Sequence, residues 1–472
     1  MVTLNTVPIL NKESGDQHSP PLASSLPDSL RPDMLWAASA ATLVAVAFLV
    51  GHLHLGIVTP LINATPLQRM NLVRAAPLLA RWLPHASWGT PAALAIAAMA
   101  IVFASRIAQA LSWRPLTFVV WFTSAAWSMA LAMIDGWNRG FATKLSSPTD
   151  YLVQVHRVTG ISSFLHHFAA SIGSGHSGWN IQVAAHPPGA LLTFVGLHRL
   201  GLGAPVWASA FCVVTGSSAA MAIVIAVRAI SDEQTARRAA PFLAIGPAAI
   251  WIAVSADAYF GAVAAWGLAL LALSASRRVR FPGATSLAAG LLLSCSVFLD
   301  YGLALMVIPA VAIMVGTRNF RPLLGTVGGA LIVTASYASF GFWWLTGLDH
   351  VRHLYAVGIA RLRPYAYWVW GDPAALVCAT GLAPAAAIHR AFDRTALKKR
   401  SGLQLLIVSF CLVILVADLS GLSKAETERI WLPFAFWLTA APALLPVRSH
   451  RFWLVVQIFA ALVINSLLVT VW

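Results

Sequence analysis

The chain has 472 residues, of which 59% are hydrophobic and only 10% are charged, whereas a soluble domain carries about 25% charged residues. Several apolar stretches reach the length of about 20 residues that a helix needs to cross the hydrocarbon layer. The sequence therefore predicts an all-α, polytopic membrane protein and excludes a soluble enzyme. The net charge of +15 does not indicate a nucleic-acid partner, because most basic residues lie in short connections between apolar stretches.

Thirteen membrane spans are predicted in chain order. They cover residues 34–57, 89–111, 114–134, 205–230, 239–254, 256–275, 283–299, 301–316, 322–344, 374–391, 403–418, 430–446 and 452–471. With the N-terminus in the cytoplasm, every short basic connection lies inside, as the positive-inside rule requires. Residues 1–33 are polar and proline-containing and lack the features of a signal peptide, so we expect a disordered cytoplasmic tail.

This topology leaves one large segment, residues 135–204, on the outer face. The apolar piece 187–200 inside it has about 14 residues, too few to span, and is predicted to be a juxtamembrane helix. The remaining outer connections are 58–88, 345–373 and 419–429. Nine acidic residues fall on this face, at or just beyond span ends: Asp135, Asp150, Asp257, Asp300, Asp349, Asp372, Asp418, Glu426 and Glu428. Acids also avoid the anionic inner surface, but their gathering beside a long segment points to chemistry on the outer face.

Asp135 follows a predicted span directly, in the run Met133-Ile134-Asp135-Gly136. A partly desolvated carboxylate held at a helix end suits a general base that takes a proton from a hydroxyl. A helix-ending Asp-Gly turn explains the same residues without any chemistry. Asp150 is the second candidate base, and a helix N-cap is its alternative interpretation.

The most specific short motif is His186-Pro187-Pro188-Gly189. The prolines favour the first turn of a helix and keep His186 extended and outside it, so the imidazole is presented where a phosphate could also bind. A simple helix start is the alternative. The other histidines of segment 135–204 show no i, i+4 pair, and the four cysteines show no CxxC spacing, so no metal site is predicted from them.

The late outer connections carry the cationic candidates. Segment 345–373 contains Arg363 and Tyr365, and the run 423–429 contains Lys424, Glu428 and Arg429. Basic residues on the outer face oppose the topological bias, and an anionic partner such as a lipid-linked phosphate explains them. Snorkelling to lipid headgroups is the alternative.

Together these features resemble the C-type (GT-C fold) glycosyltransferases, a superfamily of multispan enzymes that use polyprenyl-phosphate sugars. The resemblance covers roughly residues 114–300. It rests on Asp135 after an early span, the long first outer segment, the His186 to Gly189 motif and the Ser255-Ala256-Asp257 turn. Two spans precede this core, and the paired Asp-Glu of some branches is absent here.

The resemblance implies an inverting transferase of the bacterial plasma membrane, with its active site outside the cytoplasm. Its donor would be a polyprenyl-phosphate sugar and its acceptor a glycan, lipid or protein of the cell envelope. Asp135, with Asp150 as substitute, would be the base, and His186 would orient the acceptor or phosphate. The binding candidates are Asp257, Arg363, Tyr365, Lys424, Glu428 and Arg429.

The leaving phosphate is already an anion, so the reaction needs no general acid, and a divalent metal is compatible with it but not required.

We expect residues 34–113 to form two accessory spans, residues 114–344 to form the catalytic core and residues 345–472 to contribute C-terminal spans. A transporter or lipid flippase is the rival function, with a structural envelope partner as the third. Midplane charges, broken helices and inverted repeats are typical of transporters, and the sequence shows no charge within a span core and no clear repeat.

Overall fold

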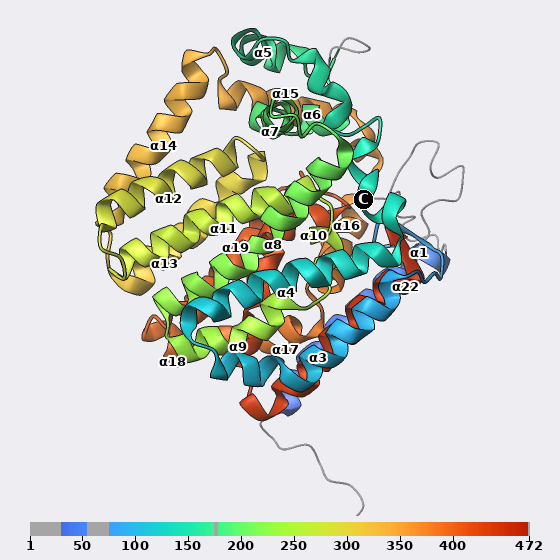
Figure 1. Cartoon of the computed structure of the whole chain (residues 1–472), viewed down its shortest axis with the longest axis vertical. Coiled ribbons are helices and arrows are strands. Elements are labelled where there is room, and N and C mark those ends of the chain that lie inside the picture. The colour runs from blue at the N-terminus through green and yellow to red at the C-terminus, as the bar shows by residue number, and fades with distance from the viewer. Residues whose placement is uncertain (1–29, 54–74, 174–177, 471–472) are drawn as a thin grey trace, which may run out of the picture.

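The computed structural model describes residues 30–53, 75–173 and 178–470, and this part of the chain is nearly all helical (Figure 1). Most of the expected tail, most of the connection 58–88 and His176 lie outside the described residues, whereas residues 31–33 at the end of the expected tail form the start of a helix. Eight described helices are long and apolar enough to cross a membrane. They are α1 (Arg31–Leu53), α3 (Gly89–Ala110), α4 (Trp113–Ile134), α8 (Pro205–Ile230), α11 (Ala256–Ala275), α14 (Pro322–Ser339), α19 (Gly402–Leu419) and α22 (His450–Leu467). The prediction of an all-α polytopic membrane protein is confirmed.

Five of the thirteen predicted spans are interrupted or form shorter helices than predicted. The prediction of thirteen continuous spans was therefore too simple. These segments form α9 (Glu233–Ala244) with α10 (Ala249–Ile252), α12 (Pro282–Val297), η6 (Tyr301–Met306) with α13 (Val307–Thr317), α16 (Tyr365–Thr380) with α17 (Leu382–Ala391), and α20 (Thr427–Ile430), α21 (Leu432–Leu438) and η8 (Ala441–Leu444). The axes of α16 and α17 differ by 108°. A bend of this size marks a broken span or a re-entrant loop.

Side chains of neighbouring helices satisfy the backbone at these breaks. Between α16 and α17, Gly381 adopts a φ of +82°, and the buried Gln457 of α22 donates to the Thr380 carbonyl at 2.7 Å and accepts from the Ala383 amide at 3.2 Å. Between α9 and α10, the indole of Trp127 donates to the Gly246 carbonyl at 3.1 Å. Interrupted helices are tolerated within a membrane where such partners replace the lost backbone bonds.

Helices α4, α8 and α11 lie side by side in the centre of the molecule, with α12 and α14 stacked outward from α11 (Figure 1). Small residues let α8 and α11 approach closely. A Cβ on Gly216 of α8 would lie 2.8 Å from the Cβ of Ala258 in α11. Close packing of small residues is typical of helix association in lipid, where the hydrophobic effect does not drive helices together.

The two ends of this bundle differ. At one end Arg237 donates to the carbonyls of Ala108 and Leu111, at 2.6 and 2.9 Å, so the basic start of α9 lies at the connection between α3 and α4. Short elements make up the expected segment 135–204. They are η1 (Asn138–Ala142), η2 (Lys144–Ser146), η3 (Leu152–Arg157), α5 (Ile161–His167), η4 (Ala169–Ser171), α6 (Ile181–Ala185) and α7 (Pro188–Arg199).

Figure 1 shows α5, α6 and α7 gathered with α15 (Trp344–Val357) at one extremity of the molecule, far from α18 (Arg394–Lys398). The segment 345–373, predicted to be a loop, is instead helical in α15, η7 (Ile359–Leu362) and the first half of α16. Asp372 accordingly lies inside a helix, where its side chain is buried. The remaining short element is η9 (Val447–Ser449).

The C-terminal end of the chain forms a strand that the sequence did not predict. β2 (Leu468–Thr470) pairs antiparallel with β1 (Ala80–Trp82), with Ala80 opposite Thr470. The predicted span 452–471 therefore ends as helix α22 at Leu467. Two further bonds, from the Leu83 amide to the Leu467 carbonyl and from the His85 amide to the Ser466 carbonyl, extend this pairing and fix the position of His85.

Candidate functional site

Three ionisable side chains that are distant in sequence meet at one end of the bundle. His186 lies between α6 and α7, Asp257 lies in the first turn of α11, and Asp300 lies between α12 and η6. One ligand atom from each of them lies within 4.8 Å of the others. We call these three residues the central cluster.

The backbone around the prolines orients His186. It caps α6 in an extended conformation, as the two prolines predicted. Its Nδ1 lies 2.8 Å from the Gln182 carbonyl oxygen, which can only accept, so Nδ1 carries a proton. Nε2 then turns toward Asp257 and lies 3.9 Å from its Oδ1. The imidazole also contacts the rings of Tyr151 and Phe260, with centroid distances of 5.8 and 5.6 Å.

Asp257 is the most deeply buried carboxylate of the cluster, with 2% of its surface exposed. Ser255 caps α11 by accepting from the Asp257 amide at 3.1 Å, and its hydroxyl also donates to Oδ2 of Asp257 at 3.1 Å. Arg429 donates to the same Oδ2 at 2.6 Å. A buried charge needs such a paired partner. The sequence named both members of this pair and not their contact.

Asp300 was noted from the sequence only as one of the acids of the outer face. It caps η6, accepting from the Gly302 amide at 2.7 Å, and burial raises the pKa of its carboxyl group. A close approach brings the histidine motif beside it, because a Cβ on Gly189 would lie only 2.4 Å from the Phe298 carbonyl oxygen. Only glycine permits α7 to come this near the end of α12.

Asp150 and Tyr151 border the central cluster. The Asp150 carboxylate accepts from the Tyr151 amide at 2.8 Å. Burial raises the pKa of Asp150 to about 6, and Arg429, Asp257 and His186 all interact with it electrostatically. The Tyr151 side chain is 2% exposed, and its hydroxyl has no hydrogen-bond partner within the described residues. An unsatisfied buried hydroxyl is costly in a folded protein.

The cationic residues predicted from the late connections form a chain of ion pairs that leads to the cluster. Arg363 pairs with Glu426 and donates to the Lys424 carbonyl at 2.6 Å. Glu426 lies 3.6 Å from Arg429, which pairs with Asp257. Consecutive positive φ angles bend the backbone here, 66° at Ala425 and 64° at Glu426. Such strain in residues other than glycine is typical of functional sites.

Three other predicted binding residues lie apart from the central cluster. Lys424 packs over the Tyr355 ring, with its Nζ 5.8 Å from the ring centroid. The Tyr365 hydroxyl donates to the Asp418 carbonyl at 3.4 Å. Glu428 is fully buried and accepts from the Leu79 amide at 3.0 Å, and burial raises its pKa to about 7. These contacts give the three residues structural partners in the protein.

Asp135 lies at the end of α4, as predicted, but in its own ion-pair group. His85 Nε2 lies 2.6 Å from Asp135 Oδ1, and His85 Nδ1 lies 2.8 Å from the Leu83 carbonyl oxygen. Arg139 is 3.7 Å away from the same Oδ1. The imidazole of His85 therefore bridges the Asp135 carboxyl group to the backbone. Asp135 is held in place as the partner of this histidine.

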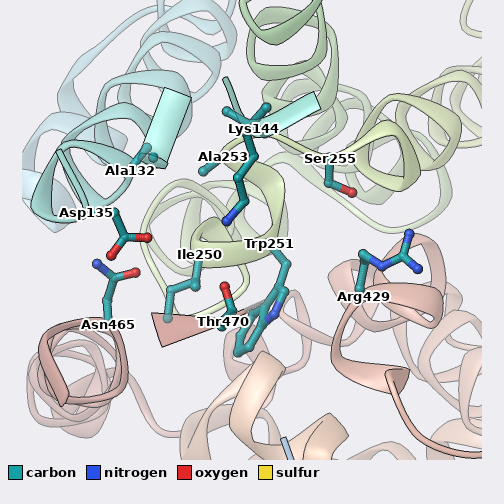
Figure 2. Close-up of a pocket in the computed structure, with 12 residues that line it drawn as sticks. Ala132, Asp135, Lys144, Ile250, Trp251, Ala253, Ser255, Arg429, Asn465 and Thr470 are labelled. Carbon is teal, nitrogen blue, oxygen red and sulfur yellow. The ribbon is translucent and has the colours of Figure 1, made fainter. Parts of the chain in front are cut away.

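Asp135 and Arg429 nevertheless line the same small pocket. Figure 2 shows Asp135 and Arg429 on opposite sides of it, with the Lys144 side chain reaching in between. Burial lowers the pKa of Lys144 to about 8. Ser255 also lines the pocket, so the pocket adjoins the turn that carries Asp257.

Sequence reasoning missed His85, Lys144, Tyr151 and Glu426 as members of these groups. Tyr151 stands next to the named Asp150, and Glu426 was noted only as one of the outer-face acids. His85 had no local signal, because the strand pair β1–β2 places it.

Comparisons with known proteins are sparse. No family model and no curated protein matches the chain. Part of the chain is similar to solved structures of an oligosaccharyltransferase from Archaeoglobus fulgidus. The form tethered to an acceptor peptide is 14% identical with a TM-score of 0.39, over 70% of this chain and 49% of that one. The complex with Zn and sulfate is 16% identical with a TM-score of 0.39, over 73% and 51%.

A third structure, of the archaeal enzyme with an inhibitory peptide and a dolichol-phosphate, is 14% identical with a TM-score of 0.38, over 70% of this chain and 50% of that one. The present chain thus spans about half the length of the solved chains that it matches. A likeness at this TM-score assigns neither a family nor a residue role to this chain.

Proposed function

We propose that the chain is a membrane-embedded inverting glycosyltransferase of the C-type superfamily. It would move a sugar from a polyprenyl phosphate to a glycan, lipid or protein acceptor at the outer face of a bacterial plasma membrane. The observation that carries this proposal is the meeting of His186, Asp257 and Arg429 at one end of a helical bundle. Acid, imidazole and guanidinium groups buried together suit the transfer of a group that leaves as a phosphate anion.

The chemical step requires a base and an anion site. The base takes the proton of the acceptor hydroxyl, whose oxygen attacks the anomeric carbon as the bond from that carbon to the phosphate oxygen breaks. The bonding electrons leave with the phosphate. An attack opposite the departing phosphate inverts the anomeric configuration. No group needs to protonate the leaving phosphate.

Asp150 suits the role of base better than Asp135 does. With a pKa of about 6, its carboxyl group is ionised at neutral pH and more basic than an exposed aspartate, as efficient proton transfer demands. Asp135 is paired with His85 at 2.6 Å, which lowers the availability of its carboxylate. Asp135 remains the second candidate, since it lines the pocket that Arg429 and Lys144 also line.

Arg429 and Lys144 are the cations best placed for the donor phosphate. Both line the pocket, and a guanidinium group offers a phosphate two parallel hydrogen bonds. Arg363 would act indirectly, because it pairs with Glu426, which in turn contacts Arg429. His186 would orient the acceptor or the phosphate through Nε2, since its Nδ1 is committed to the Gln182 carbonyl.

The test is transfer of a radiolabelled sugar from polyprenyl phosphate to envelope acceptors, using the purified full-length chain in vesicles. Asp150→Asn should lower kcat by 10²–10⁴-fold, the usual contribution of a general base, while leaving the folded yield intact. Asp135→Asn should lower it far less. Asp349→Asn, which changes an exposed carboxylate on α15, is the matched control.

Full activity in Asp150→Asn together with loss in Asp135→Asn would reverse the base assignment. Full activity in both variants would remove a carboxylate base from the mechanism. No transfer by the wild-type chain with any envelope acceptor would refute the glycosyltransferase proposal itself.

A lipid transporter or flippase is the second candidate, and the broken helices favour it. Both the α9–α10 interruption and the 108° bend between α16 and α17 are features that transporters use near their binding sites. The same vesicles separate the two functions. Movement of the labelled lipid between leaflets without sugar transfer would establish transport, whereas transfer without movement would establish the enzyme.

A further inference from the structure

We propose that the central cluster of His186, Asp257 and Asp300 binds one divalent transition-metal cation. The proposal rests on three observations that are independent of the function: the spacing of the ligand atoms, the excess of buried acidic groups and the buried Tyr151 hydroxyl, which has no hydrogen-bond partner within the described residues. The use of the ion in catalysis, by contrast, rests on the proposed glycosyltransferase function.

The spacing of the cluster suits a metal ion. A cation with ligands at about 2.1 Å sets neighbouring ligand atoms about 3 Å apart and opposite ones about 4.2 Å apart. The three ligand atoms here lie within 4.8 Å of one another, and His186 Nε2 is 3.9 Å from Asp257 Oδ1. A small contraction around an ion would therefore bring all three into its coordination shell.

The imidazole already has the arrangement found in metal sites. Metal-binding histidines usually donate their other ring N–H to a carbonyl or carboxylate, which fixes the tautomer and the ring orientation. His186 donates from Nδ1 to the Gln182 carbonyl at 2.8 Å. Its side chain is about nine-tenths buried, and Nε2 makes no hydrogen bond within the described residues. The free lone pair of Nε2 therefore points at the two carboxylates.

Acidic groups outnumber cationic groups at the site. Asp150, Asp257 and Asp300 interact with one another, and the guanidinium of Arg429 pairs with Asp257. Buried carboxylates are strongly unfavourable unless they are paired or bound to a metal. A divalent cation in the cluster would stabilise all of them.

The Tyr151 hydroxyl provides a further observation. It is buried, has no hydrogen-bond partner among the described residues, and interacts electrostatically with Asp257, Asp150 and Asp300. Water bound to a metal ion donates strong hydrogen bonds, so a water on an ion in the cluster would satisfy this oxygen. A cluster held by protons alone leaves the hydroxyl orphaned.

The mixed donor set indicates the type of cation. Mg²⁺ and Ca²⁺ prefer oxygen ligands and water, whereas an imidazole with two carboxylates suits Mn²⁺, Fe²⁺ or Zn²⁺. Three protein ligands leave coordination positions open for water or for a phosphate oxygen. In the proposed enzyme, those positions would let the bound ion and Arg429 hold the departing phosphate together.

Mn²⁺ is the probe that tests the proposal, because its electron paramagnetic resonance (EPR) signal reports both affinity and ligand type. The full chain in detergent micelles should bind one Mn²⁺, and pulsed EPR should show coupling to an imidazole ¹⁴N nucleus. His186→Ala should remove this coupling, and Asp300→Asn should weaken Mn²⁺ binding on the order of 10-fold or more. The controls His167→Ala and Asp349→Asn change exposed groups and should bind as the wild type does.

The wild-type spectrum decides the proposal even if a variant fails to fold. Absence of saturable binding, or Mn²⁺ bound without nitrogen coupling, would overturn it. Affinity that stays unchanged in folded His186→Ala and Asp300→Asn would also overturn it. Sugar transfer that persists in EDTA without bound Mn²⁺ would refute a catalytic use of the metal and leave the glycosyltransferase proposal standing. Mn²⁺ binding without any sugar transfer would support the metal site and refute the proposed function.

Discussion

The buried carboxyl group of Glu428 gives a prediction that does not depend on the function. Its side chain is fully buried, one oxygen accepts from the Leu79 amide at 3.0 Å, and the other has no partner within the described residues. Burial raises its pKa from 4.5 to about 7. We expect Glu428→Gln to stabilise the folded protein above pH 7, because glutamine keeps the bond to the amide and never ionises.

The sign and size follow from proton linkage. Between pH 4.5 and about 7 the folded chain retains a proton that the unfolded chain has lost, so the free energy of unfolding falls as the pH rises through this window. A shift of about 2.5 pKa units corresponds to about 3 kcal/mol, at 1.36 kcal/mol per unit. The penalty is complete above pH 7 and absent below pH 4.5, where Glu428 is protonated in both states.

Chemical unfolding in detergent micelles at pH 4.5, 6 and 8 measures this difference. The variant should exceed the wild type by up to about 3 kcal/mol at pH 8 and match it at pH 4.5. Asp349→Asn serves as the control, because it changes an exposed carboxylate. A Glu428→Gln chain that is no more stable at pH 8, or one that gains equally at all three pH values, would refute the assignment of a buried carboxyl with a raised pKa.

Three further outcomes are expected. In Gly189→Ala the new Cβ would lie 2.4 Å from the Phe298 carbonyl oxygen, so α7 must move by about 1 Å. Because this shift displaces the neighbouring His186, kcat/KM for sugar transfer should fall on the order of 100-fold in folded protein. His85→Ala removes the hydrogen-bond partner of Asp135 and should lower the free energy of unfolding by about 1.5–3 kcal/mol, measured by chemical unfolding. With Lys144 titrating near 8, donor KM should rise as the pH passes from 7 to 9, and Lys144→Met should abolish this change.

The sequence predicted the long apolar helices well, because a run of about 20 apolar residues has few alternatives to a span. It failed where apolar runs are interrupted. A hydropathy window reports composition, whereas a break depends on whether a distant side chain can bond the freed backbone groups. Gln457 bonds the freed backbone groups of Thr380 and Ala383, and no residue near Gly381 in the sequence indicates this partner.

The site was predictable in its residues and not in its contacts. His186, Asp257 and Arg429 were all named from the sequence, yet the Asp257–Arg429 pair joins positions 172 apart in numbering. Asp300 lacked a motif and was noted only among the acids of the outer face. Asp135 was found at the predicted helix end. Its partner His85 is positioned by a backbone bond to Ser466 of α22, next to the β1–β2 pairing, and no local sequence pattern indicates this contact.

The failures of span prediction and the position of the site have one physical cause. Asp257 follows the interruption between α9, α10 and α11, and Arg429 lies in the short α20, at the start of the segmented run to Leu444. A continuous helix buries its backbone bonds within itself, so it offers neither a free helix start nor a sharp turn to aim a charged group inward. Interrupting the helices costs backbone bonds, and it supplies the turns from which Ser255 and Arg429 reach Asp257. The helix interruptions therefore belong to the site, and a substitution that straightened one of them would displace a charged group together with the backbone.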